Sequence, residues 1–224
     1  DVKVFESPKL ELEQYPTSPH IAARILHVMH GLGDLEGRAV VDLGCGCGIL
    51  ALGASLLGSG YTLGVDIDAD ALETARLNAS ILGIEGHLGT DFLVSNIHTM
   101  RGPQDDEALR KNARSFPWKF DVVVMNPPFG TRTRGADVEF LRTAASIVNY
   151  EGVVYSLHKA STRNHIAKVA TRLGATSAEV LAQLRFDIPH MYRFHRKESQ
   201  DVEVDLWRVQ FRKAISSSRR AFRP

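Results

Sequence analysis

The sequence predicts a single α/β domain built on a mostly parallel sheet of seven strands with helices on both faces. Apolar runs of strand type alternate with runs of helical periodicity along most of the chain, a pattern typical of β-α-β units. The last two strand-like runs have no helix between them, so we expect a C-terminal antiparallel hairpin. The 224 residues are 44% hydrophobic and 24% charged, ordinary values for a globular protein that exclude a mainly disordered chain.

The predicted elements follow one another in a regular order. Short β-branched and apolar runs indicate strands over residues 39–43, 62–65, 87–94, 120–125, 152–157, 178–186 and 202–211. Apolar residues at helical spacing indicate helices over residues 21–30, 49–57, 69–82, 138–148 and 162–173. Asp137 and Ser161 directly precede the last two helices, so each is expected to be an N-cap.

Three stretches lie outside this alternation. Residues 1–20 are punctuated by prolines, and residues 101–119 form a polar insertion that we expect to be a loop with one short helix. The end of the chain is rich in serine and arginine. We therefore divide the chain into an N-terminal segment (1–20), one domain (21–211) and a basic flexible tail (212–224).

The net charge of +1 hides an asymmetry. Residues 1–184 carry 17 Lys and Arg against 21 Asp and Glu, whereas residues 185–224 carry 10 against 5. A basic end suits an anionic partner, although a solvated tail would look the same. Cys45 and Cys47 are too few for a disulfide framework and lack neighbouring metal ligands, so we expect no metal site and an intracellular compartment. No apolar run is long enough for a membrane helix.

A glycine-rich loop follows the first predicted strand. Residues 42–48 read DLGCGCG, and alternating glycines let the backbone turn and approach a ligand closely. Ile49 stands where a dinucleotide fingerprint would need glycine, and Asp42 would repel a pyrophosphate. A cationic or zwitterionic ligand fits better. Asp66 ends the second predicted strand, where a carboxylate can bind ribose hydroxyls.

The sequence NPPF at residues 126–129 follows the strand at 120–125. The Asn126 side-chain oxygen and the Pro127 carbonyl can accept the two N–H bonds of a planar amine such as N6 of adenine. The two prolines stiffen the turn, and Phe129 offers a face on which a base can stack. Such a site would position the amine for an in-line displacement and would need no strong general base.

These motifs resemble class I S-adenosylmethionine-dependent methyltransferases, and NPPF resembles the signature of the amine and amide methyltransferases. More narrowly, four motifs are similar to the methyltransferase-like protein five family, eukaryotic enzymes that make N6-methyladenosine in small-subunit ribosomal RNA. The motifs are LEQYPT (12–17), DLGCGCG (42–48), NPPFGT (126–131) and YSLHK (155–159). The resemblance extends from about residue 5 to residue 211.

The resemblance implies a Rossmann-like class I methyltransferase domain with S-adenosylmethionine as cofactor, covered by the N-terminal segment. Asp91 is expected to end the third strand, where adenine contacts lie in this fold, unless it is an ordinary turn aspartate. The implied catalytic residues are Asn126, Pro127, Pro128 and Phe129. The implied cofactor-binding residues are Gln14, Thr17, Asp42, Gly44, Cys47, Ile49, Asp66, Asp91 and Phe92.

The resemblance also implies two partners. One is ribosomal RNA of the small subunit, which would place the protein in the nucleus, nucleolus or cytoplasm. The other is a small zinc-binding activator protein that forms a heterodimer by adding a strand beside His87–Val94, since an unpaired edge invites strand addition. The insertion at 101–119 and the basic tail depart from the family pattern.

Other residues leave alternatives open. Tyr192, Arg193, His195, Arg196 and Lys197 form a basic and aromatic loop that could hold RNA phosphates or be a solvated turn. His158 and Lys159 could contact the target nucleotide, or His158 could be a structural histidine.

Two other functions compete with RNA adenine methylation. A protein glutamine amide presents the same planar NH₂ group, but the basic loop argues against this substrate. A non-catalytic binding module of the same fold is the third interpretation. The intact Asp42, Asp66 and Asn126 argue against it.

Overall fold

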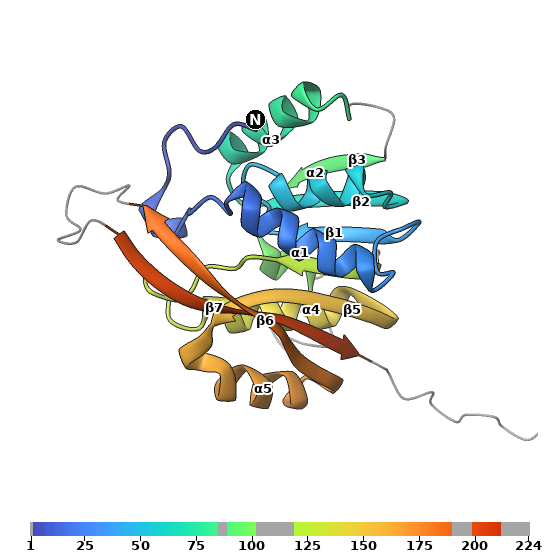
Figure 1. Ribbon diagram of the computed structural model, residues 1–224, viewed down its shortest axis with the longest axis vertical. Coiled ribbons are helices and arrows are strands. Elements are labelled where there is room, and N and C mark those ends of the chain that lie inside the picture. The colour runs from blue at the N-terminus through green and yellow to red at the C-terminus, as the bar shows by residue number, and fades with distance from the viewer. Residues whose placement is uncertain (1, 85–88, 102–118, 190–198, 212–224) are drawn as a thin grey trace, which may run out of the picture.

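The computed structural model describes residues 2–84, 89–101, 119–189 and 199–211. They form a seven-stranded sheet in the order β3-β2-β1-β4-β5-β7-β6 (Figure 1). The strands are β1 (Ala39–Leu43), β2 (Tyr61–Asp66), β3 (Thr90–Val94), β4 (Phe120–Met125), β5 (Val148–Lys159), β6 (Ala175–Pro189) and β7 (Ser199–Phe211). The α-helices are α1 (Pro19–Gly31), α2 (Ile49–Leu56), α3 (Ala69–Ile81), α4 (Ala136–Ile147) and α5 (Arg163–Arg172). The predicted fold class is confirmed.

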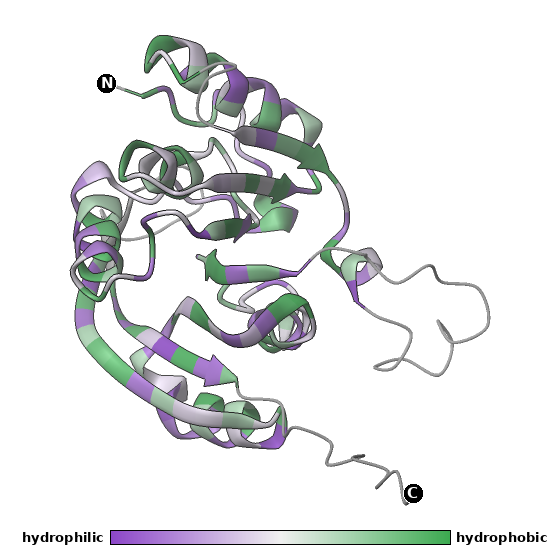
Figure 2. Cartoon of the chain, turned by 90° about the vertical axis from the view of Figure 1, so that its right-hand side faces the viewer, coloured by the Kyte–Doolittle hydropathy of each residue, from purple (hydrophilic) through white to green (hydrophobic). Residues whose placement is uncertain are grey.

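Two apolar clusters lie on opposite faces of the sheet. In β4, Val123 and Met125 belong to the cluster that contains residues of α4 and α5. Val122 and Val124 belong instead to the cluster that contains residues of α1 and α2. This alternation follows from the two-residue period of a strand, and it explains why a central strand covered on both faces is a continuous apolar run. In Figure 2 the helices that cover the sheet carry both hydrophobic and hydrophilic residues.

The first five strands are parallel, and the last strand is antiparallel to both of its neighbours. β6 and β7 form the predicted hairpin, and β7 inserts between β5 and β6. β3 pairs with β2 and forms one edge of the described sheet, as predicted. No helix in the described residues is long and apolar enough to span a membrane.

Both N-cap predictions are wrong. α4 begins one residue before Asp137, with Gly135 as N-cap in the left-handed conformation (φ 80°). The Asp137 carboxylate lies instead 3.4 Å from Nδ1 of the buried His158. α5 is preceded by a single 3₁₀ turn (Ala160–Thr162), so its N-cap is Thr162 and not Ser161.

Several predictions fall outside the described residues. These include residues 85–88 at the start of the predicted third strand and residues 102–118 of the insertion. The basic and aromatic loop at 192–197 and the tail at 212–224 also lie there.

Candidate functional site

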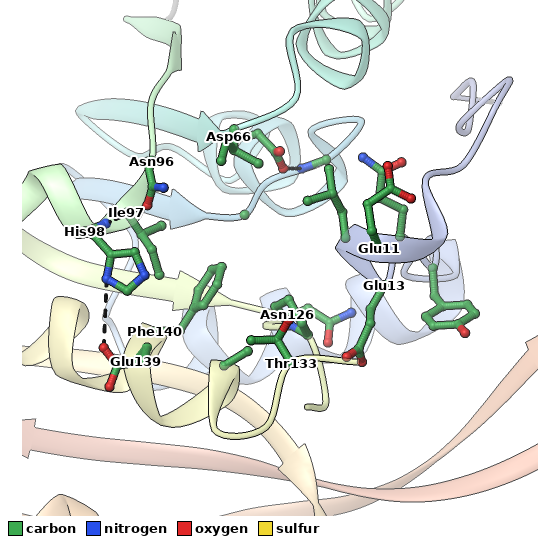
Figure 3. A pocket seen from close by; sticks show the side chains of 18 of the residues that line it. Glu11, Glu13, Asp66, Asn96, Ile97, His98, Asn126, Thr133, Glu139 and Phe140 are labelled. Atoms are coloured by element: carbon green, nitrogen blue, oxygen red, sulfur yellow. Dashed lines mark hydrogen bonds and ion pairs between the residues drawn. The ribbon is translucent and has the colours of Figure 1, made fainter. Parts of the chain in front are cut away.

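A cavity of about 380 Å³ opens where the parallel strands end (Figure 3). A smaller hollow of about 60 Å³ shares part of its wall, including Asn126. A volume of this order is typical of small-molecule sites. Predicted residues that line one or both spaces are Gln14, Thr17, Asp42, Gly44, Cys47, Ile49, Asp66, Asn126 and Pro128.

The glycine loop after β1 is held against β2 by its own backbone. The N–H groups of Gly44 and Cys45 both donate to the Val65 carbonyl, at 2.8 and 3.0 Å. Gly44 and Gly46 have positive φ angles of 69° and 52°. A Cβ atom on Gly44 would lie 2.9 Å from the Phe140 ring, and one on Gly46 would lie 2.8 Å from the Phe5 ring. Glycine is therefore required at both positions by conformation and by space.

Asp66 ties this loop to the end of β2. Its Oδ2 accepts the Gly46 N–H at 2.8 Å, and its Oδ1 accepts the Asp68 N–H at 2.9 Å. Burial raises the pKa of Asp66, although these backbone hydrogen bonds oppose the shift. Each carboxylate oxygen can accept a further bond, so this residue can still bind hydroxyl groups of a ligand.

Asp42 is a fully buried carboxyl group beneath the loop. Its Oδ2 accepts the Ala51 N–H at 3.0 Å, whereas Oδ1 has no hydrogen-bond partner in the described part of the chain. Burial, reinforced by the charge of Asp66, raises its pKa to about 7. Asp42 and Asp66 both lie at this wall of the site, where a cationic ligand would favour the ionised forms of their carboxyl groups.

In the Asn126 side-chain amide, the nitrogen has a hydrogen-bond partner and the oxygen has none among the described residues. Its Nδ2 donates to the Thr17 hydroxyl at 2.9 Å, which fixes the orientation of the amide. Its Oδ1 is buried and has no hydrogen-bond partner among the described residues. A buried acceptor is rarely left unpaired in proteins, and such an atom on a cavity wall is suited to an N–H donor of a ligand.

Phe129 lies behind the cavity lining. Its ring contacts the Phe186 ring edge-on, with centroids 6.0 Å apart, and Lys159 Nζ lies 6.0 Å from the Phe129 centroid. Pro127 is buried. His158 is also buried, with Nε2 2.8 Å from the Ser156 hydroxyl, so the structural interpretation of this histidine agrees with the geometry.

The N-terminal segment crosses the cavity and is tied to the start of α3. Gln14 Nε2 donates to Asp68 Oδ2 at 2.7 Å, while Gln14 Oε1 accepts the Lys9 N–H at 2.7 Å. Lys9 Nζ donates to Asp68 at 2.6 Å and to Asp70 at 2.8 Å. Burial acts to raise the pKa of Asp68, but the hydrogen bonds from Lys9 and Gln14 outweigh it and hold this pKa below its ordinary value.

The predicted position of Asp91 is wrong. This residue is the second of β3, and the strand continues to Val94 because Phe92 and Leu93 pair with β2. The exposed Asp91 carboxylate accepts a hydrogen bond from the Tyr61 hydroxyl at 3.1 Å. Phe92 packs against Cys45 of the glycine loop, and a Cβ atom on Gly64 of β2 would lie 2.6 Å from its ring. Neither Asp91 nor Phe92 is among the residues lining the two spaces described above.

Sequence reasoning missed several lining residues. Asn96 and Ile97 follow β3, and Phe140 projects from α4 into the same space (Figure 3). Ser95 and Asn96 are two polar residues directly after the third strand, and this pattern could have indicated Asn96 as a lining residue. At the far end of the cavity, the Arg101 guanidinium lies 2.7 Å from the Glu139 carboxylate. No local pattern in the sequence points to this ion pair.

Comparisons with known proteins agree with this geometry. The family model described as "Ribosomal protein L11 methyltransferase (PrmA)" matches residues 23–126. The rRNA N(6)-adenosine-methyltransferase METTL5 of Danio rerio is 45% identical over 206 residues, covering 91% of each chain. The Drosophila melanogaster protein of the same description is 42% identical over 92% of this chain and 90% of its own. The crystal structure of PH1948 from Pyrococcus horikoshii superposes with a TM-score of 0.76 at 31% identity, over 95% of this chain and 93% of that one.

Substituting Asp42→Asn is expected to stabilise the ligand-free protein at neutral and higher pH. The pKa of Asp42 is raised from 3.8 to about 7 on folding, so between these values the folded protein holds a proton that the unfolded chain has released. The free energy of unfolding therefore falls as pH rises through this window, by on the order of a few kcal/mol. Asn at position 42 does not titrate, so the free energy of unfolding of the variant should decrease less between these pH values.

Urea unfolding at several pH values between about 4 and 8 measures this difference. Asp91→Asn, a change of the same kind at an exposed site, serves as the control and should follow the wild-type curve. Identical pH dependence in the wild type and Asp42→Asn would contradict the prediction.

Proposed function

Because the chain belongs to the METTL5 family of rRNA N(6)-adenosine-methyltransferases, we propose that it methylates N6 of an adenosine in small-subunit ribosomal RNA. The observation that carries this proposal is the buried, unpaired Oδ1 of Asn126 on the cavity wall. An exocyclic amine supplies the N–H donor that this acceptor lacks. We place the enzyme in the compartments that hold this RNA, the nucleus with its nucleolus or the cytoplasm.

S-adenosylmethionine is the cofactor, and the residues present fit it. The cofactor supplies a methyl group on a positively charged sulfur atom. The raised pKa values of Asp42 and Asp66 mean that a nearby cation would favour their ionised forms. We infer that the Asp66 carboxylate accepts the ribose hydroxyls, as an acid at the end of the second strand does in related folds. The backbone of Gly44 and Gly46 forms part of the cavity wall itself.

Asn126 would act on the target amine by position and by hydrogen bonding. With Nδ2 committed to Thr17, the amide presents its oxygen, and not its nitrogen, to the amine. We infer that the Pro127 carbonyl accepts the second N–H. Receiving the methyl group that the cofactor would supply would leave a positive charge on the nitrogen, which would then lose a proton to water. Acceptors aimed at the N–H groups stabilise that developing charge.

The surroundings of the cavity support an RNA substrate. Arg132 and Arg134 are exposed on residues 130–135, directly after the NPPF motif, and Lys159 lies beside Phe129. Cations at the mouth of a site attract phosphates. The match to the L11 methyltransferase model ends at Asn126, so it includes neither Arg132 nor Arg134.

We also propose a heterodimer with a small zinc-binding activator protein, which would add a strand beside β3. Three observations support a partner at this edge. β3 pairs on one side only within the described residues. Val94 is 48% exposed, and Leu77 and Ile81 of α3 are 43% and 49% exposed. Arg76 of α3 donates to the Phe92 carbonyl at 3.3 Å, so the helix and the edge strand form one surface.

Replacing Asn126 with alanine should reduce methyl transfer to RNA by at least about 100-fold, because the amine loses its acceptor. Cofactor affinity should change by less than about threefold, since the contact acts mainly in the transition state. Thr17→Val should give an intermediate loss, because the amide orientation is no longer fixed. Single-turnover rates with labelled cofactor, together with calorimetric binding, separate the two effects.

The matched control is Asn149→Ala, which removes an amide that bonds Asp121 away from the cavity. It should retain wild-type turnover. If Asn126→Ala weakened cofactor binding as strongly as catalysis, Asn126 would belong to the cofactor site and our assignment would be wrong.

The partner proposal predicts that Val94→Asp and Ile81→Asp reduce co-purification with the activator, because each places a charge in the apolar contact. Leu56→Asp, at a residue of α2 that is 55% exposed, is the control and should leave complex formation unchanged. Size-exclusion chromatography of co-expressed chains measures this. A monodisperse and fully active isolated chain would argue against the heterodimer.

A further inference from the structure

Glu13 lies in the cofactor-covering segment and has an unusual backbone conformation. It follows the 3₁₀ turn η1 (Leu10–Leu12) with φ 50°, and Glu151 is the other non-glycine residue with positive φ in the described part of the chain. Glu13 is also 7% exposed, although its side chain is a carboxylate. Left-handed backbone and a buried charge both cost free energy, and such costs concentrate at functional positions.

The Glu13 carboxylate reaches across the cavity to the substrate side. Its Oε1 accepts the backbone N–H of Arg132 at 2.7 Å, a contact between residues 119 positions apart. Its Oε2 is buried without a hydrogen-bond partner in the described residues. Figure 3 shows this carboxylate beside Asn126 and Thr133. Arg132 and Thr133 belong to the substrate loop, defined here as residues 130–135, which connects the NPPF motif to α4.

Neighbouring residues of the same segment contact the other parts of the site. Gln14 binds Asp68 at the start of α3, two residues after Asp66. Thr17 binds Asn126. Residues 13–17 therefore join the cofactor side, the catalytic asparagine and the substrate loop within a single short stretch. Displacing this stretch would release all three contacts together.

We propose that Glu13 is a positioning residue that couples cofactor binding to the placement of the substrate loop. When the N-terminal segment is held over the cofactor, Glu13 holds the N–H of Arg132 and fixes the loop that carries Arg132 and Arg134 at the mouth of the site. The substrate loop is therefore in place to bind RNA only after the N-terminal segment has covered the cofactor. The role of this loop toward RNA rests on the proposed function, whereas the coupling itself does not.

Hydrogen exchange of the substrate loop tests the coupling directly and needs no methyl transfer. In the wild-type complex with its activator, S-adenosylhomocysteine should slow exchange of the peptide containing residues 130–135. In Glu13→Ala this protection should fall by about tenfold, the effect expected from losing a hydrogen bond to a charged acceptor. Glu13→Gln keeps a neutral carbonyl acceptor and should retain part of the protection.

The control is Glu6→Ala, which removes the same charge from an exposed position of the same segment. In this variant, S-adenosylhomocysteine should slow exchange of residues 130–135 as much as in the wild type. Cofactor-induced protection that is equal in the wild type and Glu13→Ala would overturn the proposal. Equal loss in Glu13→Gln and Glu13→Ala would also overturn it, because the backbone hydrogen bond would then not be the link.

Steady-state kinetics give a second readout. Glu13→Ala should raise KM for RNA by about tenfold at saturating cofactor, and because the coupling is reciprocal the cofactor Kd should rise by no more than the same factor. A loss of cofactor affinity well beyond about tenfold would make Glu13 a cofactor ligand and contradict its role as a positioning residue. If the wild-type complex itself failed to methylate RNA, the proposed function would fail, but the exchange experiment would still decide the role of Glu13.

Discussion

The pairing of β1 with β4 brings the two chemical halves of the site together. Leu43 lies opposite Met125 in this register, so Gly44 and Asn126 leave the sheet side by side. The strand order β3-β2-β1-β4 shows that the chain reverses its direction of progress across the sheet between these two strands. Ligands of open α/β sheets bind at such a switch point, beyond the carboxyl ends of the strands. Buried apolar side chains on both faces of β1 and β4 hold this register.

Electrostatics divides the site into an inner and an outer part. Carboxyl groups of Asp42, Asp66 and Glu13 are buried in the interior, and burial raises the pKa of Asp42 and of Asp66. Arg132 and Arg134 lie exposed at the mouth. A cationic cofactor suits the first environment and a phosphate backbone suits the second. The N-terminal segment lies between the two parts and contacts both. Glu13, Gln14 and Thr17 make these contacts, with Arg132, Asp68 and Asn126.

The sequence predicted those features that depend on a local pattern. The glycine loop, Asp66 and Asn126 each directly follow or end an apolar strand, and all lie where the pattern places them. Features that depend on distant contacts were missed. Asp137 turns toward His158 and does not cap α4. The predicted strand over residues 87–94 does end at Val94, so Asp91, the second residue of β3, lies before the end at which it was placed. Glu13 and the Arg101–Glu139 pair have no local signature, since their partners lie far away in the sequence.

The central claim is that the unpaired oxygen of Asn126 accepts the N6 amine of an adenosine in RNA. The most direct measurement supplies S-adenosylmethionine with a labelled methyl group to the chain, co-expressed with its activator, and to small-subunit ribosomal RNA that lacks the modification. The RNA is then digested and its nucleosides are separated. We expect the label to be recovered in N6-methyladenosine. Unlabelled RNA from an enzyme that still binds the cofactor, with label instead in a protein glutamine, would contradict the account.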